Sequence, residues 1–400
     1  MTNFLIIGNG VAGTTAAEHI RKTDQGGKIT MVTDEDLPFY HRLRLNDFVV
    51  GEVTEQALIV KDPQWYQDRG IDLSLRQRVI DADPVQKVVM TEHQQFPYDR
   101  LLLATGSHSF IPPIQGADKK GAFALRTIQD ARDITAFARD IQDVVLIGGG
   151  LLGLEAGNAL RRLGKRVTVV EFFPRLLPRQ LDVDGAKRLQ ELMENMGFSF
   201  RLGAKTEAIS GEETVDGVVL EGGESISAQM VIISAGVRPN LQLAGPLGLA
   251  QDKGIQVNER LQTSRSDVYA AGDVAEFRGI PYGIWPAAME QGKIAGTNMA
   301  GGDRVYEGTT MANVLKVVGI DLASAGNIDA ENESASRVVQ DEDVYKKIIL
   351  EEDRITGCIM LGNTKGFNKI TRAMSEGRGV SELHDLLTSE GFSDAAVKGD

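Results

Sequence analysis

The chain has 400 residues, of which 42% are hydrophobic and 25% charged, and this length and composition predict a globular protein of two to three domains. Its formal net charge of −13 argues against general binding to nucleic acid or anionic membranes, both of which attract basic proteins. The single cysteine, Cys358, excludes an internal disulfide and a dithiol redox pair, and with no apolar run near the roughly 18 to 20 residues of a membrane span, a cytoplasmic location is expected.

The first predicted elements form a βαβ unit. Residues 4–7 (FLII) are a short apolar run typical of a buried parallel strand, and the sequence GNGVAG follows at residues 8–13. A helix-compatible stretch at 14–21 and a second strand at 29–32 complete the unit. A glycine-rich turn in this context is the dinucleotide-binding fingerprint.

Each glycine of this turn has a physical role. Gly8 permits the tight turn, Gly10 lets the backbone approach a pyrophosphate, and Gly13 lets the helix pack closely on the strand. The free N–H groups at the helix start then face the phosphate charge. The predicted dinucleotide ligands are Gly8, Gly10, Val11, Ala12 and Gly13, with Glu35, or else Asp34, on a ribose hydroxyl.

The same pattern returns in the middle of the chain. A strand at 144–147 precedes GGGLLG at 148–153, and a helix at 154–163 and a strand at 165–171 follow. Because the carboxylate of Glu171 would repel a 2′-phosphate and no basic residue follows until Arg175, NADH is favoured over NADPH. The predicted ligands are Gly148, Gly150, Leu151, Leu152, Gly153 and Glu171.

Three further motifs lie between and after these units. They are LLLATG at 101–106, AGVRPN at 235–240 and VYAAGDV at 268–274. In this order, the five motifs resemble the FAD-dependent pyridine nucleotide–disulfide oxidoreductase superfamily over about residues 1 to 300. The resemblance implies that FAD binds the first unit and NADH the second.

The resemblance also assigns individual residues to the two cofactors. Asp273 would contact the ribityl chain of FAD, although an Asp after a Gly is by default an ordinary helix cap. In the helix at 287–300, Gln291 would lie beside the flavin ring. Glu155 would lie near the nicotinamide, and the alternative for it is a glutamate on a helix surface. The remaining implied cofactor contacts are Ala104, Thr105, Gly106, Gly236 and Gly272.

The absence of sulfur near the first third of the chain narrows the branch of the superfamily. The segment 38–45 (PFYHRLRL) has no cysteine where disulfide- and peroxide-reducing members carry one, so thiolate chemistry at the flavin is excluded and the flavin must discharge directly to an acceptor. Cys358 is expected to be a buried small hydrophobe. This segment and residues 314–320 (VLKVVGI) look like NADH:rubredoxin oxidoreductases and, in part, the nitrite reductase flavin domain.

In those relatives, a basic residue from each of the two segments lies near the isoalloxazine. The resemblance thus implies that Arg42 and Lys316 stabilise negative charge as hydride arrives, although Lys316 could also be a surface lysine. Together with Glu155 they are the candidate catalytic residues. No metal site is expected, because the five histidines show no ligand spacing.

The predicted fold class is α/β, with two Rossmann-like dinucleotide-binding domains and a small α+β C-terminal domain. The FAD domain is expected at 1–108 and 235–302, the NAD domain at 109–234 and the last domain at 303–400. Strands are predicted at 312–318, 345–350 and 354–361, and helices at 367–375 and 380–389.

The C-terminal domain also carries locally basic residues, Lys365, Lys369, Arg372 and Arg378, which could steer an acidic carrier such as a rubredoxin or could be an ordinary solvated face. The expected function is hydride transfer from NADH to FAD and electron transfer to a small redox protein. The alternatives are a reductase of another acceptor, such as a ferredoxin or the nitrite reductase system, and a flavin-based redox sensor.

Overall fold

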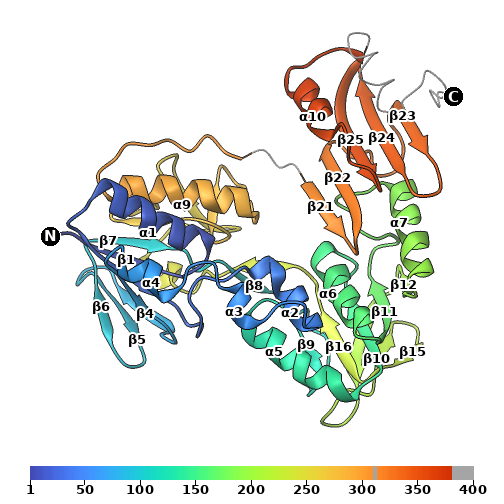
Figure 1. Cartoon of the computed structure of the whole chain (residues 1–400), viewed down its shortest axis with the longest axis horizontal. Helices are drawn as coiled ribbons and strands as arrows, with labels where there is room; N and C mark the ends of the chain where they lie inside the picture. Colours follow the sequence, from blue (N-terminus) through green and yellow to red (C-terminus); the bar gives the residue numbers. More distant parts are fainter. Residues whose placement is uncertain (310–312, 381–400) are drawn as a thin grey trace. The chain divides into compact units, whose positions relative to one another are not determined.

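The computed structural model describes residues 1–309 and 313–380, which form two compact units (Figure 1). The first unit contains Met1–Phe110, Arg126–Ile128 and Val237–Thr310. The second contains Ile111–Leu125, Gln129–Gly236 and the described part of Met311–Asp400. The chain therefore passes from the first unit into the second, back into the first, and into the second again.

The first unit is built on a parallel sheet with the strand order β19-β7-β1-β2-β3. Its central strand is buried on both faces, as the apolar run at residues 4–7 predicts. The strands are β1 (Asn3–Ile7), β2 (Lys28–Val32), β3 (Ile71–Ser74), β7 (Arg100–Leu103) and β19 (Val268–Ala270).

Alternate residues of β1 face two different layers. Phe4 and Ile6 pack with the helices α1 (Val11–Thr23) and α9 (Trp285–Met299). Leu5 and Ile7 pack with the antiparallel strands β4–β6 and the short helix α8 on the other face. The bounds are β4 (Val79–Asp83), β5 (Val88–Thr91), β6 (Gln95–Pro97) and α8 (Ala244–Leu247).

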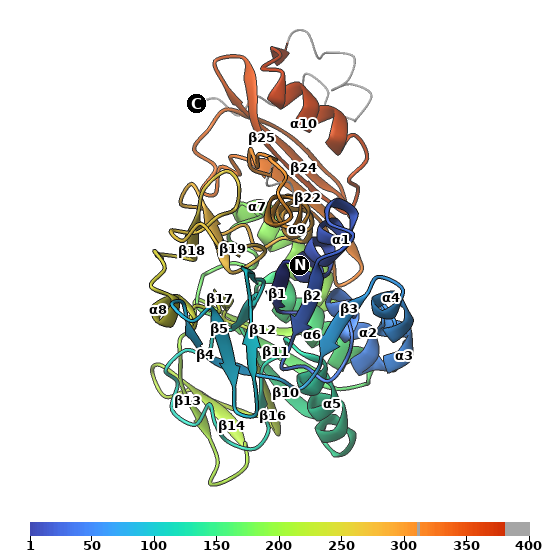
Figure 2. The same cartoon turned by 90° about the vertical axis from the view of Figure 1, so that its left-hand side faces the viewer.

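The helices α1 and α9 lie side by side and touch through small residues (Figures 1 and 2). A Cβ atom at Gly292 would lie 2.4 Å from the carbonyl oxygen of Ala12, and one at Gly296 would lie 2.3 Å from that of Ala16. Any larger residue would force the helices apart, and this close crossing places the loop before α1 next to the start of α9.

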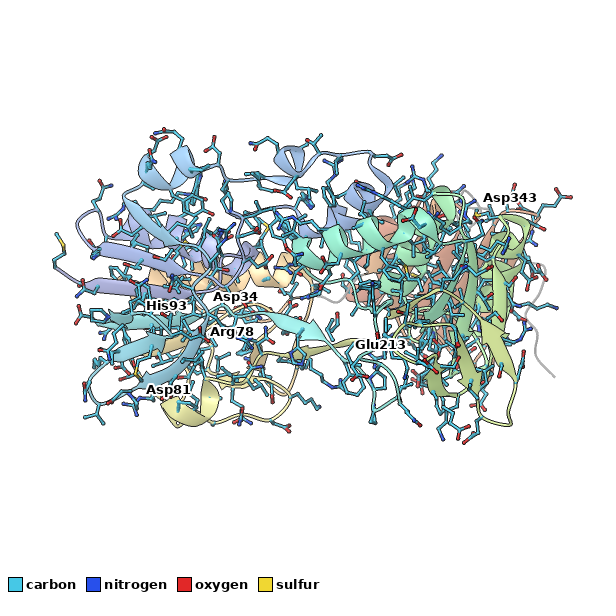
Figure 3. All side chains as sticks on the ribbon, turned by 90° about the horizontal axis from the view of Figure 1, so that it is seen from below. Asp34, Arg78, Asp81, His93, Glu213 and Asp343 are labelled. Atoms are coloured by element: carbon cyan, nitrogen blue, oxygen red, sulfur yellow. The ribbon has the colours of Figure 1, made fainter. Side chains whose placement is uncertain are left out.

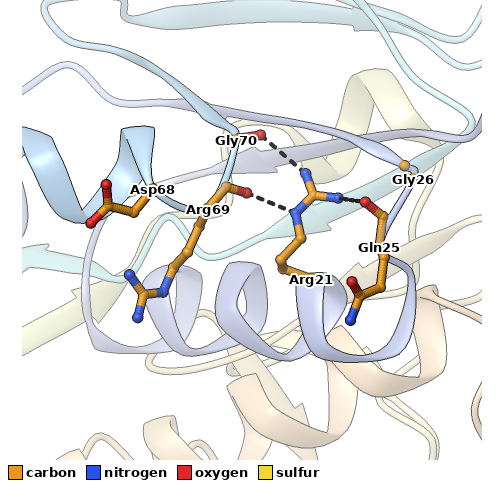
Figure 4. A pocket seen from close by; sticks show the side chains of 7 residues that line it. Arg21, Gln25, Gly26, Asp68, Arg69 and Gly70 are labelled. Carbon is orange, nitrogen blue, oxygen red and sulfur yellow. Dashed lines mark hydrogen bonds between the residues drawn. The ribbon is translucent and has the colours of Figure 1, made fainter.

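The far end of α1 is fastened by Arg21 (Figure 4). Its Nε donates to the carbonyl of Arg69 at 2.7 Å, and its terminal nitrogens donate to the carbonyls of Gly70 and Gln25. The shallow pocket at this point is lined by the same residues. Since the guanidinium of Arg21 is already bound to backbone carbonyls, we assign this pocket a structural role and not a binding role.

The other elements of the first unit are shorter. They are η1 (Arg42–Arg44), α2 (Leu45–Val50), α3 (Glu55–Leu58), α4 (Pro63–Gln67), the pair β8 (Ser107–Ser109) and β17 (Val237–Pro239), and the pair β18 (Ile255–Val257) and β20 (Ala275–Phe277).

The second unit repeats the parallel architecture with the strand order β12-β11-β10-β16-β9 and an antiparallel β13-β14-β15 layer. Its strands are β9 (Ala122–Phe123), β10 (Asp143–Ile147), β11 (Arg166–Glu171), β12 (Ser199–Leu202), β13 (Thr206–Ser210), β14 (Gly217–Leu220), β15 (Ser225–Ser227) and β16 (Met230–Ile233). Its helical elements are α5 (Ile128–Phe137), η2 (Ala138–Asp140), α6 (Leu151–Arg162) and α7 (Val183–Asn195).

The C-terminal part of the second unit is an antiparallel sheet with the order β21-β22-β25-β24-β23, and a helix packs against it (Figure 2). The helix α10 (Phe367–Ser375) buries Phe367, Ile370 and Ala373 on one face, at the spacing of a helical stripe. The strands are β21 (Asn313–Val317), β22 (Ile320–Gly326), β23 (Ser336–Gln340), β24 (Tyr345–Glu351) and β25 (Arg354–Leu361).

The predicted fold class is confirmed, with two parallel Rossmann-like sheets and an α+β C-terminal part. Both predicted βαβ units are present, and the helix predicted at 367–375 is α10. The strands β22 and β23 were not predicted, because their sequences, IDLASAG and SRVVQ, carry few large apolar residues. The helix predicted at 380–389 lies almost entirely outside the described residues.

Candidate functional site

The first glycine-rich loop has the geometry that its sequence predicts. Gly8 has φ +107°, and a Cβ there would lie 2.1 Å from the carbonyl oxygen of Ala104. A Cβ at Gly13 would lie 2.1 Å from the carbonyl oxygen of Gly8. A Cβ at Gly10 would meet no described atom within 4 Å. The outer glycines are thus required by the fold, whereas Gly10 borders open space where a ligand can approach.

The second loop repeats this arrangement position by position. Gly148 has φ +111°, and a Cβ there would lie 2.3 Å from the carbonyl oxygen of Ser234. A Cβ at Gly153 would lie 2.5 Å from the carbonyl oxygen of Gly148, and one at Gly150 would meet no described atom within 4 Å.

The helices α1 and α6 begin directly after these loops. Their caps, Gly10 and Gly150, have no side chain that could satisfy the first-turn N–H groups. Val11, Ala12, Leu151 and Leu152 lie in these first turns and offer backbone N–H groups at the positive end of each helix. Both loops therefore fit a pyrophosphate, as the fingerprint predicts.

Glu35, the predicted ribose ligand, accepts hydrogen bonds from two side chains. Tyr40 donates its hydroxyl proton to Glu35 at 2.5 Å, and Arg42 donates to the other carboxylate oxygen. Asp34, the alternative, is exposed, and its position is labelled in Figure 3. Glu35 is the partly buried member of the pair, which fits a binding position better than the exposed Asp34.

Arg42 is held from two sides. Its Nη1 donates to the carbonyl of Arg126 at 2.6 Å, in addition to its contact with Glu35. Burial lowers the pKa of Arg42, but the interactions with Glu35, Tyr40 and Asp273 together outweigh burial, and the net shift of the pKa is upward. The guanidinium is therefore a fixed cation, which is the property that the predicted role requires.

The second flavin motif is built around Asp273, and here the structure adds a residue that sequence reasoning missed. Arg126 lies 2.8 Å from the Asp273 carboxylate and 2.6 Å from the hydroxyl of Ser107, which itself donates to Asp273 at 2.7 Å. Burial lowers the pKa of Arg126, partly offset by Asp273. Nothing in the local sequence marks Arg126, because its partners lie 19 and 147 residues away.

Gln291 supports the same motif from behind. It is fully buried, and its side-chain carbonyl accepts the N–H of Gly272 at 2.8 Å. Gly272 has φ +81°, and a Cβ there would lie 3.0 Å from that of Ala12. The amide of Gln291 thus positions the turn that carries Asp273.

The motifs at 101–106 and 235–240 meet where the chain leaves and re-enters the first unit. The side-chain amide of Asn240 donates to the carbonyl of Thr105 at 2.7 Å, and its backbone N–H donates to that of Gly106. Gly106 and Gly236 both have positive φ, +67° and +97°. Ala104 is tied to Ile7 by a backbone bond of 2.8 Å.

Glu171, at the end of β11, turns its carboxylate toward the second loop. It accepts the N–H of Gly149 at 2.5 Å and that of Phe173 at 2.8 Å. The side chain is buried, so its position beside the loop is well determined by these two bonds. This location is that of a ribose ligand in a dinucleotide-binding domain.

Glu155 and Lys316 both belong to the second unit. Glu155, on α6, accepts the backbone N–H of Val318 at 2.6 Å and so holds the turn between β21 and β22. Val318 and Gly319 form that turn with φ of +55° and +85°. Lys316 is exposed and lies 3.8 Å from Asp321. Their roles toward the cofactors stay predictions.

The prediction that Cys358 is a buried small hydrophobe is confirmed, because its side chain is fully buried. Burial also raises the pKa of its thiol to about 12. In the part of the chain that the structure describes, no group of acidic, histidine or cysteine side chains has the arrangement of a metal site. Among the same residues, no helix combines the length and apolarity of a membrane span.

Comparison with protein families identifies two matches along the chain. Residues 2–292 match the family described as pyridine nucleotide-disulphide oxidoreductase. Residues 312–378 match the rubredoxin NAD+ reductase C-terminal domain.

Among curated proteins, a nitrite reductase [NAD(P)H] of Bacillus subtilis is 36% identical over 397 residues, which cover 98% of this chain but 49% of the relative. The chain thus spans about half the length of the nitrite and nitrate reductase relatives that it matches. An NADH-rubredoxin oxidoreductase of Clostridium acetobutylicum is 30% identical over 389 residues, covering 96% of this chain and 97% of the relative.

Solved structures agree with this result. The NADH:rubredoxin oxidoreductase from Clostridium acetobutylicum superposes with a TM-score of 0.84 at 29% identity and covers 97% of this chain and 99% of its own. An NAD-dependent persulfide reductase from A. fulgidus reaches a TM-score of 0.88 at 27% identity, covering 96% of this chain and 78% of its own.

Proposed function

The chain belongs to the pyridine nucleotide-disulphide oxidoreductase family, and from that membership we propose that it oxidises NADH and passes the electrons to a small redox protein, with rubredoxin as the first choice. Its cofactors are FAD and a nicotinamide dinucleotide. When bound, FAD supplies the chemistry of accepting hydride and releasing electrons. The observation that carries the proposal is the pair of matching glycine loops, each open at its central glycine.

The residues divide into two binding sets. The first loop, Asp273 and Glu35 hold FAD in the first domain, proposed at 1–108 and 235–302, and Gln291 and Arg126 position Asp273. The second loop and Glu171 hold NADH in a domain proposed at 109–234.

The candidate catalytic side chains act through charge. Because Arg42 is bound to Glu35, the proposed ribose ligand, its fixed positive charge would lie at the adenosine end of FAD, where it would attract the pyrophosphate. Lys316, exposed on β21, would contribute the positive charge near the isoalloxazine. Glu155 would orient the turn that follows Lys316, through its bond to Val318.

The choice of rubredoxin is supported by the match at 312–378 and by two exposed lysines among the described residues of the part proposed at 303–400. Lys365 and Lys369 are exposed beside and on α10, where they can attract an acidic carrier. A second candidate acceptor is a nitrite-reducing component, which the 36% identity to the Bacillus subtilis relative favours. A cytoplasmic location is part of the same proposal.

The test is stopped-flow reduction of the purified yellow protein, first by NADH and then by NADPH, followed by mixing with oxidised rubredoxin. We expect rapid bleaching by NADH and rapid reoxidation by rubredoxin. Bleaching without reoxidation would reject rubredoxin and leave the nitrite-reducing component to be tested. No bleaching by either nucleotide would contradict the enzyme and favour a flavin-based sensor.

A further inference from the structure

Arg175, the first basic residue after Glu171, forms an ion pair with Glu331 of the C-terminal sheet domain. Arg175 Nη1 lies 2.7 Å from Glu331 Oε1, and the arginine side chain is only 16% exposed. We propose that Glu331 holds Arg175 away from the 2′ position of the coenzyme, and that the C-terminal domain thereby helps the protein to prefer NADH to NADPH. This inference rests on the proposed role of the second loop as the NADH site.

Arg175 lies in a segment that folds back over the second loop. The backbone N–H of Leu177 donates to the carbonyl of Gly149 at 3.2 Å, and a Cβ at Gly149 would come within 2.8 Å of Leu176 Cδ2. Arg175 directly precedes Leu176, and its side chain starts beside the loop that Glu171 also contacts. An arginine near this position is the residue type that accommodates a 2′-phosphate.

Glu331 is held in place on the other side of the pair. The carbonyl of the preceding residue, Ala330, accepts the N–H of Val183 at 3.2 Å. The side chain of the following residue, Asn332, donates to Asp184 at 3.0 Å. Because both neighbours of Glu331 are bound to the start of α7, the carboxylate is presented to Arg175 by an anchored loop.

A buried cation strengthens this anchor. Lys347 Nζ lies 2.7 Å from Asp329, 3.0 Å from Asp182 and 2.5 Å from the side-chain oxygen of Asn332. The lysine side chain is 1% exposed, and Tyr345 donates its hydroxyl proton to the same Asp182 at 2.6 Å. The loop at 329–332 is therefore fixed to the nucleotide-binding half of the unit from within.

The two carboxylates then act on a 2′-phosphate in different ways. Glu171 repels it directly, and Glu331 occupies the nearby guanidinium that could neutralise it. A coenzyme with a free 2′-hydroxyl carries no charge at this position, so it is not repelled by Glu171 and does not need the guanidinium of Arg175.

The test compares two nucleotides that differ only in the 2′-phosphate, 5′-AMP and adenosine 2′,5′-bisphosphate, by calorimetric titration of the FAD-loaded protein without turnover. In Glu331→Gln, the freed Arg175 should improve the ratio of dissociation constants in favour of the bisphosphate by roughly 2- to 5-fold, the range expected from one partly exposed charge pair. Glu331→Ala, which leaves no side-chain oxygen at this position to accept from Arg175, should shift the ratio in the same direction and at least as far.

Two variants separate this effect from simple loss of negative charge. Glu333→Gln removes a charge from the same exposed loop and should leave the ratio unchanged. Arg175→Gln combined with Glu331→Gln should cancel the gain. An unchanged ratio in both Glu331 variants, or an equal gain in the double variant, would overturn the inference. Failure of the unaltered protein to bind 5′-AMP would instead reject the NADH site itself, and the inference with it.

Discussion

Glycines of one motif meet different physical demands, and the structure separates them. Gly13 faces the carbonyl oxygen of Gly8 at a distance that no side chain tolerates, whereas Gly10 faces open space. The first is needed for the helix to approach the strand, and the second only for a ligand to approach the backbone. Stability and cofactor binding should therefore respond to different substitutions within a few residues.

We predict that Gly10→Val leaves the fold intact but reduces FAD content to a small fraction of that of the unaltered protein, because the new side chain fills the phosphate space. Gly13→Val should instead destabilise the protein by about 1–3 kcal/mol or more, through overpacking. Flavin absorbance per protein and urea unfolding measure the two effects. Full FAD occupancy in a folded Gly10→Val variant would show that the first loop does not hold the pyrophosphate.

At the scale of elements, polar contacts fasten the C-terminal sheet to the nucleotide-binding half of the second unit. Glu155 on α6 holds the β21–β22 turn, and Asp182 caps α7 through Gly185 while it accepts bonds from β24. The carboxylate of Asp182 thus serves both as the N-terminal cap of α7 and as a hydrogen-bond acceptor for a strand of the C-terminal sheet. Lys347, whose side chain lies between Asp182 and Asp329, is the cation that pairs with both of these carboxylates.

Lys347→Met should lower the free energy of unfolding by about 3–5 kcal/mol, because it leaves Asp182 and Asp329 buried without a cation. Urea unfolding followed by circular dichroism measures the change. Lys187→Met, which removes an exposed lysine from α7, is the matched control and should change stability by less than about 0.5 kcal/mol. Equal effects of the two substitutions would contradict the role of the buried cluster.

The same junction predicts a dependence on pH. Burial raises the pKa of Asp329, but hydrogen bonds from Lys347 and from the N–H groups of Ser334 and Glu333 outweigh it, and the net pKa is lowered. Its stabilising contribution is therefore complete above the unfolded pKa of about 4 and is lost as the pH falls through the lower folded value. The difference in unfolding free energy between the unaltered protein and Asp329→Asn should shrink below about pH 4. A difference that grows on acidification would contradict this assignment.

At the scale of the whole molecule, an acidic chain carries a local excess of basic residues over the short segment 365–378. The formal net charge is −13, yet Lys365, Lys369, Arg372 and Arg378 are all exposed. An acidic protein would be repelled by the molecule in general and attracted only at such a place. Association with an acidic carrier should therefore depend on orientation and on salt.

The double variant Lys365→Glu/Lys369→Glu should slow reoxidation of the reduced flavin by oxidised rubredoxin about 10-fold at low salt, with a smaller difference at about 0.5 M salt because the charges are screened. Reduction by NADH should not change. Lys187→Glu serves as a control for charge alone. If the two lysine substitutions leave the reoxidation rate unchanged at low salt, the carrier docks elsewhere.

The sequence by itself determined the two βαβ units, the packing roles of Gly8 and Gly13, the helix α10 and the buried state of Cys358. Local sequence patterns predict these features, because apolar runs, turn glycines and helical spacing involve residues only a few positions apart. Only the tertiary structure decided that Arg126 meets Asp273, that Glu155 holds Val318 and that Lys347 lies between two aspartates. These partners are 147, 163, 165 and 18 residues apart, and a contact over such a separation leaves no periodic signal in the sequence. The strands β22 and β23 were missed because their sequences carry few large apolar residues, and their pairing with β25 and β24 is what makes them strands.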